Sequence, residues 1–190
     1  MIEITKYLQT VYEDLQRYVD NDVCLCKFKE LNFEAGALPD YEDINIQQLY
    51  LLRYAFAYAF EYSRMYLDVL SQMDGVNGIS VTSVGCGSMI DYWSLVHALE
   101  MKRKIDCSIR YVGIDKIDWS YKIPKRQNDE VHYLIGNAAD VFAHNSQFIS
   151  NVYFFPKSIS EFSDGELNAM ANSFSSKKIQ KNRIFCLYIS

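Results

Sequence analysis

From residue 79 onward, the sequence alternates short apolar runs with segments long enough for helices, and this alternation constrains the fold most. The apolar runs are ISVTSV (79–84), IRYVGI (109–114), VHYLIG (131–136), NVYFF (151–155) and RIFCLYI (183–189). Helices are expected over about 89–103 and about 164–178, and Ser163 with Glu166 forms a capping-box pattern ahead of the second. Strands that alternate with helices form parallel sheets with right-handed crossovers, so the sequence predicts an α/β fold with a doubly wound, mostly parallel sheet.

The first 75 residues carry helical patterns instead. Apolar residues recur at helical spacing over 2–20, at Ile4, Leu8, Val11, Leu15 and Val19. A longer helix is expected from an N-cap at Asp43 or Asn45 to about Met73, and residues 21–43 are expected to be irregular. We therefore divide the chain into an N-terminal helical cap (1–75) and a Rossmann-like domain (76–190).

The longer helix carries a ridge of tyrosines spaced four residues apart. Its members are Tyr50, Tyr54, Tyr58, Tyr62 and Tyr66. Residues at this spacing share one helix face, so the ridge is either an aromatic packing seam or the mouth of a pocket, where hydroxyls bind a ligand and rings exclude water.

Charge and composition narrow the class of partner. The chain is 49% apolar, and 19 Lys and Arg against 24 Asp and Glu leave a formal charge of −5, which does not favour nonspecific binding of nucleic acid. Two basic clusters would form an RNA track only if they converged, and a solvated face is the favoured interpretation. The clusters are Lys116, Lys122, Lys125 and Arg126, and Lys177, Lys178, Lys181 and Arg183.

Cysteine usage and the N-terminus indicate the compartment. The five cysteines are odd in number, and Cys24 and Cys26 are too close for an easy disulfide, which favours a reducing environment. No uncharged stretch approaches the roughly 18 residues of a membrane-spanning helix, and no His or Cys pair has the spacing of metal ligands. We expect a cytoplasmic protein without a membrane segment or a metal.

The chemistry centres on the turn after the first strand. Gly85 and Gly87 flank Cys86 and allow the backbone to approach a ligand closely, ahead of a helix whose positive N-terminal end favours a polar or anionic group. The third glycine of a dinucleotide fingerprint and the GK[ST] of a P-loop are both missing, so NAD, FAD and a phosphate loop are disfavoured. Asp115 ends the next strand, where a carboxylate accepts both hydroxyls of a ribose. After the third strand, Asn137 or Asp140 either binds an adenine amine or caps a helix.

At these residues the sequence resembles the class I S-adenosylmethionine-dependent methyltransferases. The match covers residues 79–190 through VTSVGCGS, YVGID, LIGNAAD and NVYFFPKS. The resemblance implies a sheet order beginning 3-2-1-4-5, S-adenosylmethionine bound at the carboxyl ends of the strands, S-adenosylhomocysteine as product, and N-terminal helices that cap the pocket. The expected cofactor-binding residues are Ser83, Gly85, Cys86, Gly87, Asp91, Asp115, Lys116, Asn137 and Ala138.

The chain departs from the family pattern in several places. Ser83 stands where the family often has an acid, Met89 where it has a small residue, and Asn137 where it often has Asp; Asp91 is a candidate carboxylate for the methionine amino group. The family usually adds an antiparallel strand pair after the fifth strand, and this sequence ends at Ser190. We expect either a truncation, an edge completed by a second copy or a partner subunit, or an inactive Rossmann-like module that serves in protein interaction.

The methyl acceptor stays open at this point. The fourth strand ends in Phe155-Pro156-Lys157-Ser158, unlike the motif of nucleobase amino-methyltransferases, so a small molecule, a protein and RNA remain as acceptors. Candidate substrate contacts are Tyr54, Tyr58, Tyr92, Phe155 and Lys157. No catalytic residue is assigned, because in-line transfer from a sulfonium mainly needs alignment and exclusion of water. Trp119 either stacks near the adenine or packs in the core.

Overall fold

The computed structural model describes residues 3–18, 39–73, 77–144, 150–156, 158–176 and 184–187. The helices are α1 (Ile4–Tyr18), α2 (Ile44–Ser71), α3 (Ile90–Met101), α4 (Ala138–His144) and α5 (Asp164–Ser176), with a 3₁₀ turn η2 (Ile159–Glu161). The strands are β1 (Gly78–Val84), β2 (Ser108–Asp115), β3 (Glu130–Ile135), β4 (Val152–Phe155) and β5 (Ile184–Leu187). All five expected strands and the four expected helices are confirmed, and α4 and η2 are additions.

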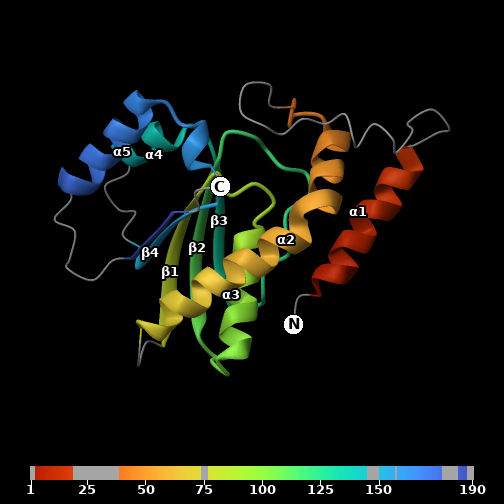
Figure 1. Cartoon of the computed structure of the whole chain (residues 1–190), viewed down its shortest axis with the longest axis horizontal. Coiled ribbons are helices and arrows are strands. Elements are labelled where there is room, and N and C mark those ends of the chain that lie inside the picture. The colour runs from red at the N-terminus through yellow and green to blue at the C-terminus, as the bar shows by residue number, and fades with distance from the viewer. Residues whose placement is uncertain are drawn as a thin grey trace.

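The strands form one parallel sheet of order β3-β2-β1-β4-β5, which confirms the predicted α/β doubly wound, Rossmann-like fold. Figure 1 shows α2 and α3 on one face of the sheet and α4 and α5 on the other. The chain leaves β1 in one direction to β2 and later returns to its other side as β4, so a crevice opens at the carboxyl ends of these strands.

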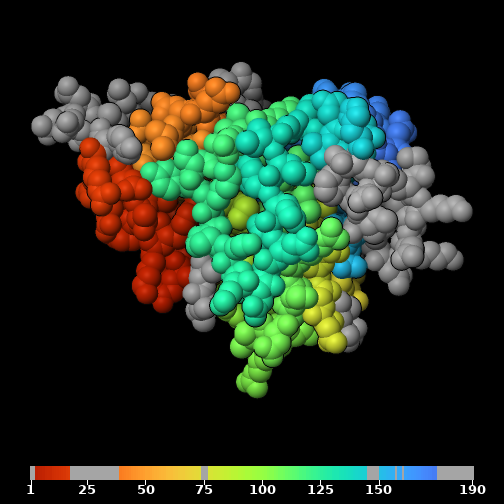
Figure 2. Space-filling model, turned by 180° about the vertical axis from the view of Figure 1, so that it is seen from behind, coloured from red at the N-terminus to blue at the C-terminus, as the bar shows by residue number. Residues whose placement is uncertain are grey.

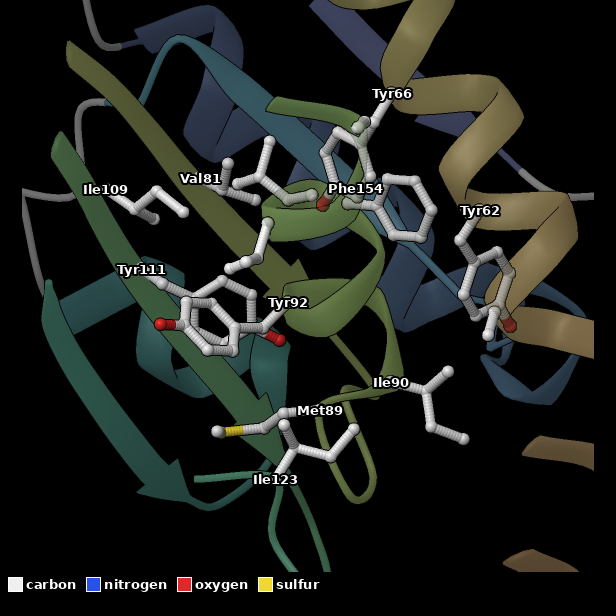
Figure 3. Packing of buried hydrophobic residues seen from close by; sticks show 14 of the residues in the cluster. Tyr62, Tyr66, Val81, Met89, Ile90, Tyr92, Ile109, Tyr111, Ile123 and Phe154 are labelled. Carbon is white, nitrogen blue, oxygen red and sulfur yellow. The ribbon is translucent and has the colours of Figure 1, made fainter. Parts of the chain in front are cut away.

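Alternate residues of each central strand enter two separate cores. On β2, Ile109 and Tyr111 pack under α1, α2 and α3, while Val112 and Ile114 pack under α4 and α5. On β4, Phe154 stacks on Tyr66 of α2 at a centroid distance of 4.8 Å. Figure 3 shows these two side chains next to each other in the core. Burial on both faces explains why these strands are continuous apolar runs in the sequence.

The N-terminal helices share the first of these cores. The apolar stripe of α1, including Leu8 and Val11, is buried, and α1 packs against α2. Asp43 caps α2 by accepting a hydrogen bond from the backbone N–H of Asn45 at 2.8 Å, as its sequence position indicates. Tyr7 donates to the carbonyl of Tyr121 at 2.9 Å, and Figure 2 shows α1 (red) against this green segment after β2.

Among the described helices, none is long and apolar enough to cross a membrane. The division of the chain near residue 75, the location in the cytoplasm and a partner at the β5 edge stay predictions.

Candidate functional site

A pocket of about 420 Å³ lies at the carboxyl ends of β1 and β2, in the crevice where the strand order reverses. Its floor is the turn after β1, and its walls come from α2, the segment before α2, the loop after β2 and the loop after β4. The N-terminal part of the chain therefore covers the pocket through α2 and residues 39–42, as the resemblance implies. The volume is within the range of about 300–1,000 Å³ typical of small-molecule sites.

The floor of the pocket is a turn with three left-handed residues. Gly85, Gly87 and Met89 have φ of +72°, +52° and +65°. A Cβ on Gly85 would lie 2.3 Å from the Cβ of Ser158, so only glycine fits there. Met89 is buried and precedes α3 without a side-chain cap, so the backbone strain of a non-glycine residue is held at the site by packing.

Asp115 ties β2 to this turn. One carboxylate oxygen accepts the backbone N–H of Gly87 at 2.7 Å, and the other accepts that of Ile117 at 2.9 Å. Burial raises the pKa of the Asp115 carboxyl group above its usual value. The hydrogen bonds from these backbone N–H groups and the charge of Lys116 reduce this rise in pKa without cancelling it. The carboxylate is thus fixed in orientation while each oxygen keeps a lone pair for a ligand in the pocket.

Asp91, in the first turn of α3, brings a second carboxylate to the pocket. It is only 1% exposed, and the hydroxyl of Tyr111 donates to both of its oxygens, at 2.9 and 3.1 Å. Burial raises its pKa to about 6, although Ser83 and Tyr111 act to lower it. Ser83 lies beside this carboxylate and makes no hydrogen bond of normal geometry within the described residues. No basic side chain pairs with Asp91 in the part of the chain that the structure describes.

The tyrosine ridge divides between core and pocket. Tyr66 is fully buried against Phe154, whereas Tyr50, Tyr58 and Tyr62 line the pocket. Tyr54 does not line it and stacks on Tyr58 at 5.4 Å. Part of the ridge is therefore a packing seam and part of it lines the pocket, while ligand binding by the tyrosine hydroxyls stays a prediction.

Two further aromatic residues, Tyr41 and Trp119, complete this wall. The ring of Trp119 lies 5.5 Å from that of Tyr50 and 5.6 Å from that of Tyr41. Gln47, buried on α2, donates to the carbonyl of Tyr41 and accepts from the N–H of Ser120, both at 2.8 Å. One α2 side chain thus holds the two segments that carry Tyr41 and Trp119.

Several predicted residues lie outside the pocket lining. Asn137 caps α4 through the N–H of Ala139 at 2.8 Å and donates to Glu166 at 2.6 Å, while its neighbour Ala138 does line the pocket. Tyr92 is fully buried, and its hydroxyl donates to Asp129. Phe155 packs under α4 and α5, on the other face of the sheet, and Lys157 is outside the described residues. Ligand roles for these residues stay predictions.

The first basic cluster is largely neutralised by acids. Lys116, which lines the pocket, pairs with Glu166 at 3.2 Å. Lys122 pairs with Asp118, and Arg126 pairs with buried Asp129 at 2.8 Å. Residues 177–183, which hold the second cluster, are outside the described residues. The structure therefore brings no basic track together among the residues it describes.

No protein-family model matches the sequence. No curated protein sequence matches it either. Among solved structures, the fold is similar to the crystal structure of MnmC2 from Aquifex aeolicus, with 15% identity and a TM-score of 0.48. The similarity covers 64% of this chain and 46% of that one, so the chain spans less than half the length of its structural neighbour. A likeness at this level supports no assignment of activity.

Some pocket residues had no signal in the sequence. Asp40, Tyr41 and Glu42 fall in a stretch that is irregular by its composition, and Ser158 and Glu161 follow a strand that is bounded only by Pro156. The one available signal is position: loops after parallel strands open at the carboxyl edge of the sheet, where ligands bind.

Proposed function

We propose that this protein is an S-adenosylmethionine-dependent methyltransferase. The observation that carries the proposal is the meeting, in one pocket at the strand-order reversal, of the Gly85–Gly87 turn, the oriented carboxylate of Asp115 and the buried carboxylate of Asp91. The reaction transfers a methyl group from the sulfonium to an acceptor that loses a proton, and it leaves S-adenosylhomocysteine. The bound cofactor supplies the activated methyl group.

The residues present fit such a cofactor. Gly85 and Gly87 carry no Cβ, so a flat nucleoside can lie close to the backbone at these two positions of the turn. Asp115 keeps acceptor capacity on both oxygens, which suits the paired hydroxyls of a ribose.

Asp91 fits the positive end of the same molecule. A buried carboxylate without a basic partner among the described residues is stabilised by any cation that enters the pocket, and its pKa near 6 leaves it mostly ionised at neutral pH. We assign Asp91 to the ammonium group of the methionine part. Tyr50, Tyr58 and Tyr62 line the pocket and would contribute to methyl transfer by excluding water from it.

Calorimetric titration with S-adenosylmethionine and S-adenosylhomocysteine, with NAD as the negative control, tests the proposal. We expect micromolar affinity, about −8 kcal/mol, and a loss of about tenfold or more in the Asp115→Ala variant. Asp118→Ala is the matched control, because this acid lies three residues on, is exposed and pairs with Lys122. Its affinity should equal that of the wild type.

Absence of binding by folded protein would overturn the proposal and favour the inactive interaction module. Equal affinities for the Asp115→Ala and Asp118→Ala variants would contradict the assigned site even if the cofactor binds.

A further inference from the structure

The pocket has a strong excess of negative charge. Five carboxylates line it: Asp40, Glu42, Asp91, Asp115 and Glu161. Lys116 is the one basic side chain in the described lining, and its ammonium group is already paired with Glu166, which does not line the pocket. Because like charges repel strongly where water is partly excluded, an acceptor bearing a phosphate or carboxylate is disfavoured here.

An aromatic wall faces the same space. Tyr41, Tyr50 and Trp119 lie within 5.6 Å of one another by ring centroids, and Tyr58 continues the wall 6.0 Å from Tyr50. Burial raises the pKa of Tyr41 and Tyr50, so both phenols are neutral and add no charge of their own. Faces of neutral tyrosine and tryptophan rings attract cations, and ammonium groups are recognised by such rings together with carboxylates.

A metal ion is a poorer explanation for the negative lining. Within the described ranges, no group of three or more His, Cys, Asp or Glu residues is close enough to hold a metal ion. The carboxylates come from the segment before α2, the first turn of α3, the end of β2 and the loop after β4, so they are spread around the pocket, an arrangement that suits an extended organic cation better than a point charge.

We propose that the methyl acceptor is a small-molecule amine, recognised as its ammonium form by Asp40, Glu42 and Glu161, the pocket carboxylates not assigned to the cofactor, and by Tyr41, Tyr50, Tyr58 and Trp119. This inference rests on the proposed methyltransferase function. The walls rise from four separate segments, so the pocket admits a small molecule or a slender group and not a folded surface.

The chemical step balances within the pocket. The ammonium group first gives up a proton to a pocket carboxylate, and the lone pair of the resulting neutral amine then forms an N–C bond with the methyl carbon. The S–C bond breaks and leaves its electron pair on sulfur. Glu161 is the candidate proton acceptor, because it lines the pocket. Desolvation and the charge of Asp115 raise its pKa, against the opposing effect of Lys116.

Three probes of one shape separate charge from size: phenethylamine, 2-phenylethanol and 3-phenylpropionate. The chain has two tryptophans, so a Trp93→Phe background leaves Trp119 as the fluorescent reporter inside the pocket. We expect the amine to bind at least about tenfold more tightly than the alcohol, and the acid to bind least, both with and without S-adenosylhomocysteine. Glu161→Gln should reduce the preference for the amine about fivefold or more, with an unchanged melting temperature.

Glu130→Gln is the matched control, because Glu130 is exposed at the start of β3, at the opposite end of the strand from the pocket. It should leave all three affinities unchanged. Equal binding of the amine and the acid, no fluorescence response to any probe, or an unaltered preference in Glu161→Gln would each overturn the inference. Failure of S-adenosylhomocysteine to bind while the amine preference persists would instead refute the methyltransferase function, and with it the role of the amine as methyl acceptor, but not the amine-binding site.

Discussion

Gly113 on β2 is a position outside the pocket lining where one added methyl group should disturb the candidate site. It pairs with Ser83 of β1, and a Cβ on it would lie 2.7 Å from the sulfur of Cys86 and 3.1 Å from a ring carbon of Tyr111. Cys86 sits in the glycine turn and is buried. Gly113→Ala must therefore push Cys86 outward and move the floor of the pocket.

The expected cost follows from these distances. Forcing an extra methyl group into a packed interior costs about 1–3 kcal/mol, offset by about 0.5–1 kcal/mol because alanine restricts the unfolded chain more than glycine does. The contact at 2.7 Å places this exchange in the upper half of the packing cost, so we expect Gly113→Ala to lose about 1–2.5 kcal/mol in urea unfolding, or roughly 2–10 °C in melting temperature. The affinity for S-adenosylhomocysteine should fall as well, because the turn shifts.

The Cys86→Ala exchange in the Gly113→Ala background tests the cause. It removes the sulfur at 2.7 Å but leaves the Cβ of residue 86 at 3.3 Å, so recovery should be large and incomplete, with a coupling energy of about 1 kcal/mol. Gly165→Ala is the control, since its nearest atom would be 4.0 Å away and the exchange should be neutral or stabilising. Wild-type stability in Gly113→Ala, or strict additivity in the double variant, would refute the reasoning.

Three further predictions concern stability. The pKa of Asp91 is raised to about 6 in the folded state, so folding takes up a proton between about pH 4 and 6. The free energy of unfolding of the wild type should therefore fall by up to about 3 kcal/mol as the pH rises through that window, whereas that of Asp91→Asn should show no such fall. A difference in unfolding free energy between the two proteins that does not change with pH would contradict this. Arg126→Ala removes the ion-pair partner of the fully buried carboxylate of Asp129 and should lower the free energy of unfolding in urea by about 3–5 kcal/mol. Arg110→Ala is the control: its ion pair is exposed, so the loss should be below about 0.5 kcal/mol. Ser163→Ala removes the capping hydroxyl of α5 and should cost about 1 kcal/mol; unchanged hydrogen exchange in the first turn of α5 would argue against the cap.

The strands were predictable because burial on both faces produces a local signal. On β2, neighbouring residues such as Tyr111 and Val112 enter opposite cores, so the run from 111 to 114 is buried, and the bounds of the strand were predicted to within one residue. The capping box of α5 was equally local, and Ser163 and Glu166 make its reciprocal hydrogen bonds. Helix α4 was missed because seven residues after Asn137 give too short a period to recognise.

The lining of the pocket was less predictable, because most of it depends on contacts between distant segments. Tyr41 and Trp119 lie side by side with the help of Gln47, which hydrogen-bonds both of their segments. Gln47 and Ser120, one of its partners, are 73 residues apart in the sequence. Glu161 lies at the pocket because the loop after β4 folds back, with Ser158 against Gly85. No spacing in the sequence encodes such contacts.

The departure at Ser83 has a physical explanation in the neighbouring helix. Ser83 points to the same core as Tyr111 and lies beside the buried carboxylate of Asp91. A second carboxylate at position 83 would place two like charges in one water-poor space, where one of them must stay protonated or the fold must open. A small hydroxyl at 83 is therefore what a carboxylate at 91 requires. The pocket keeps one buried negative charge, delivered from the first turn of α3 instead of from β1, and the charge available to a cationic ligand is retained.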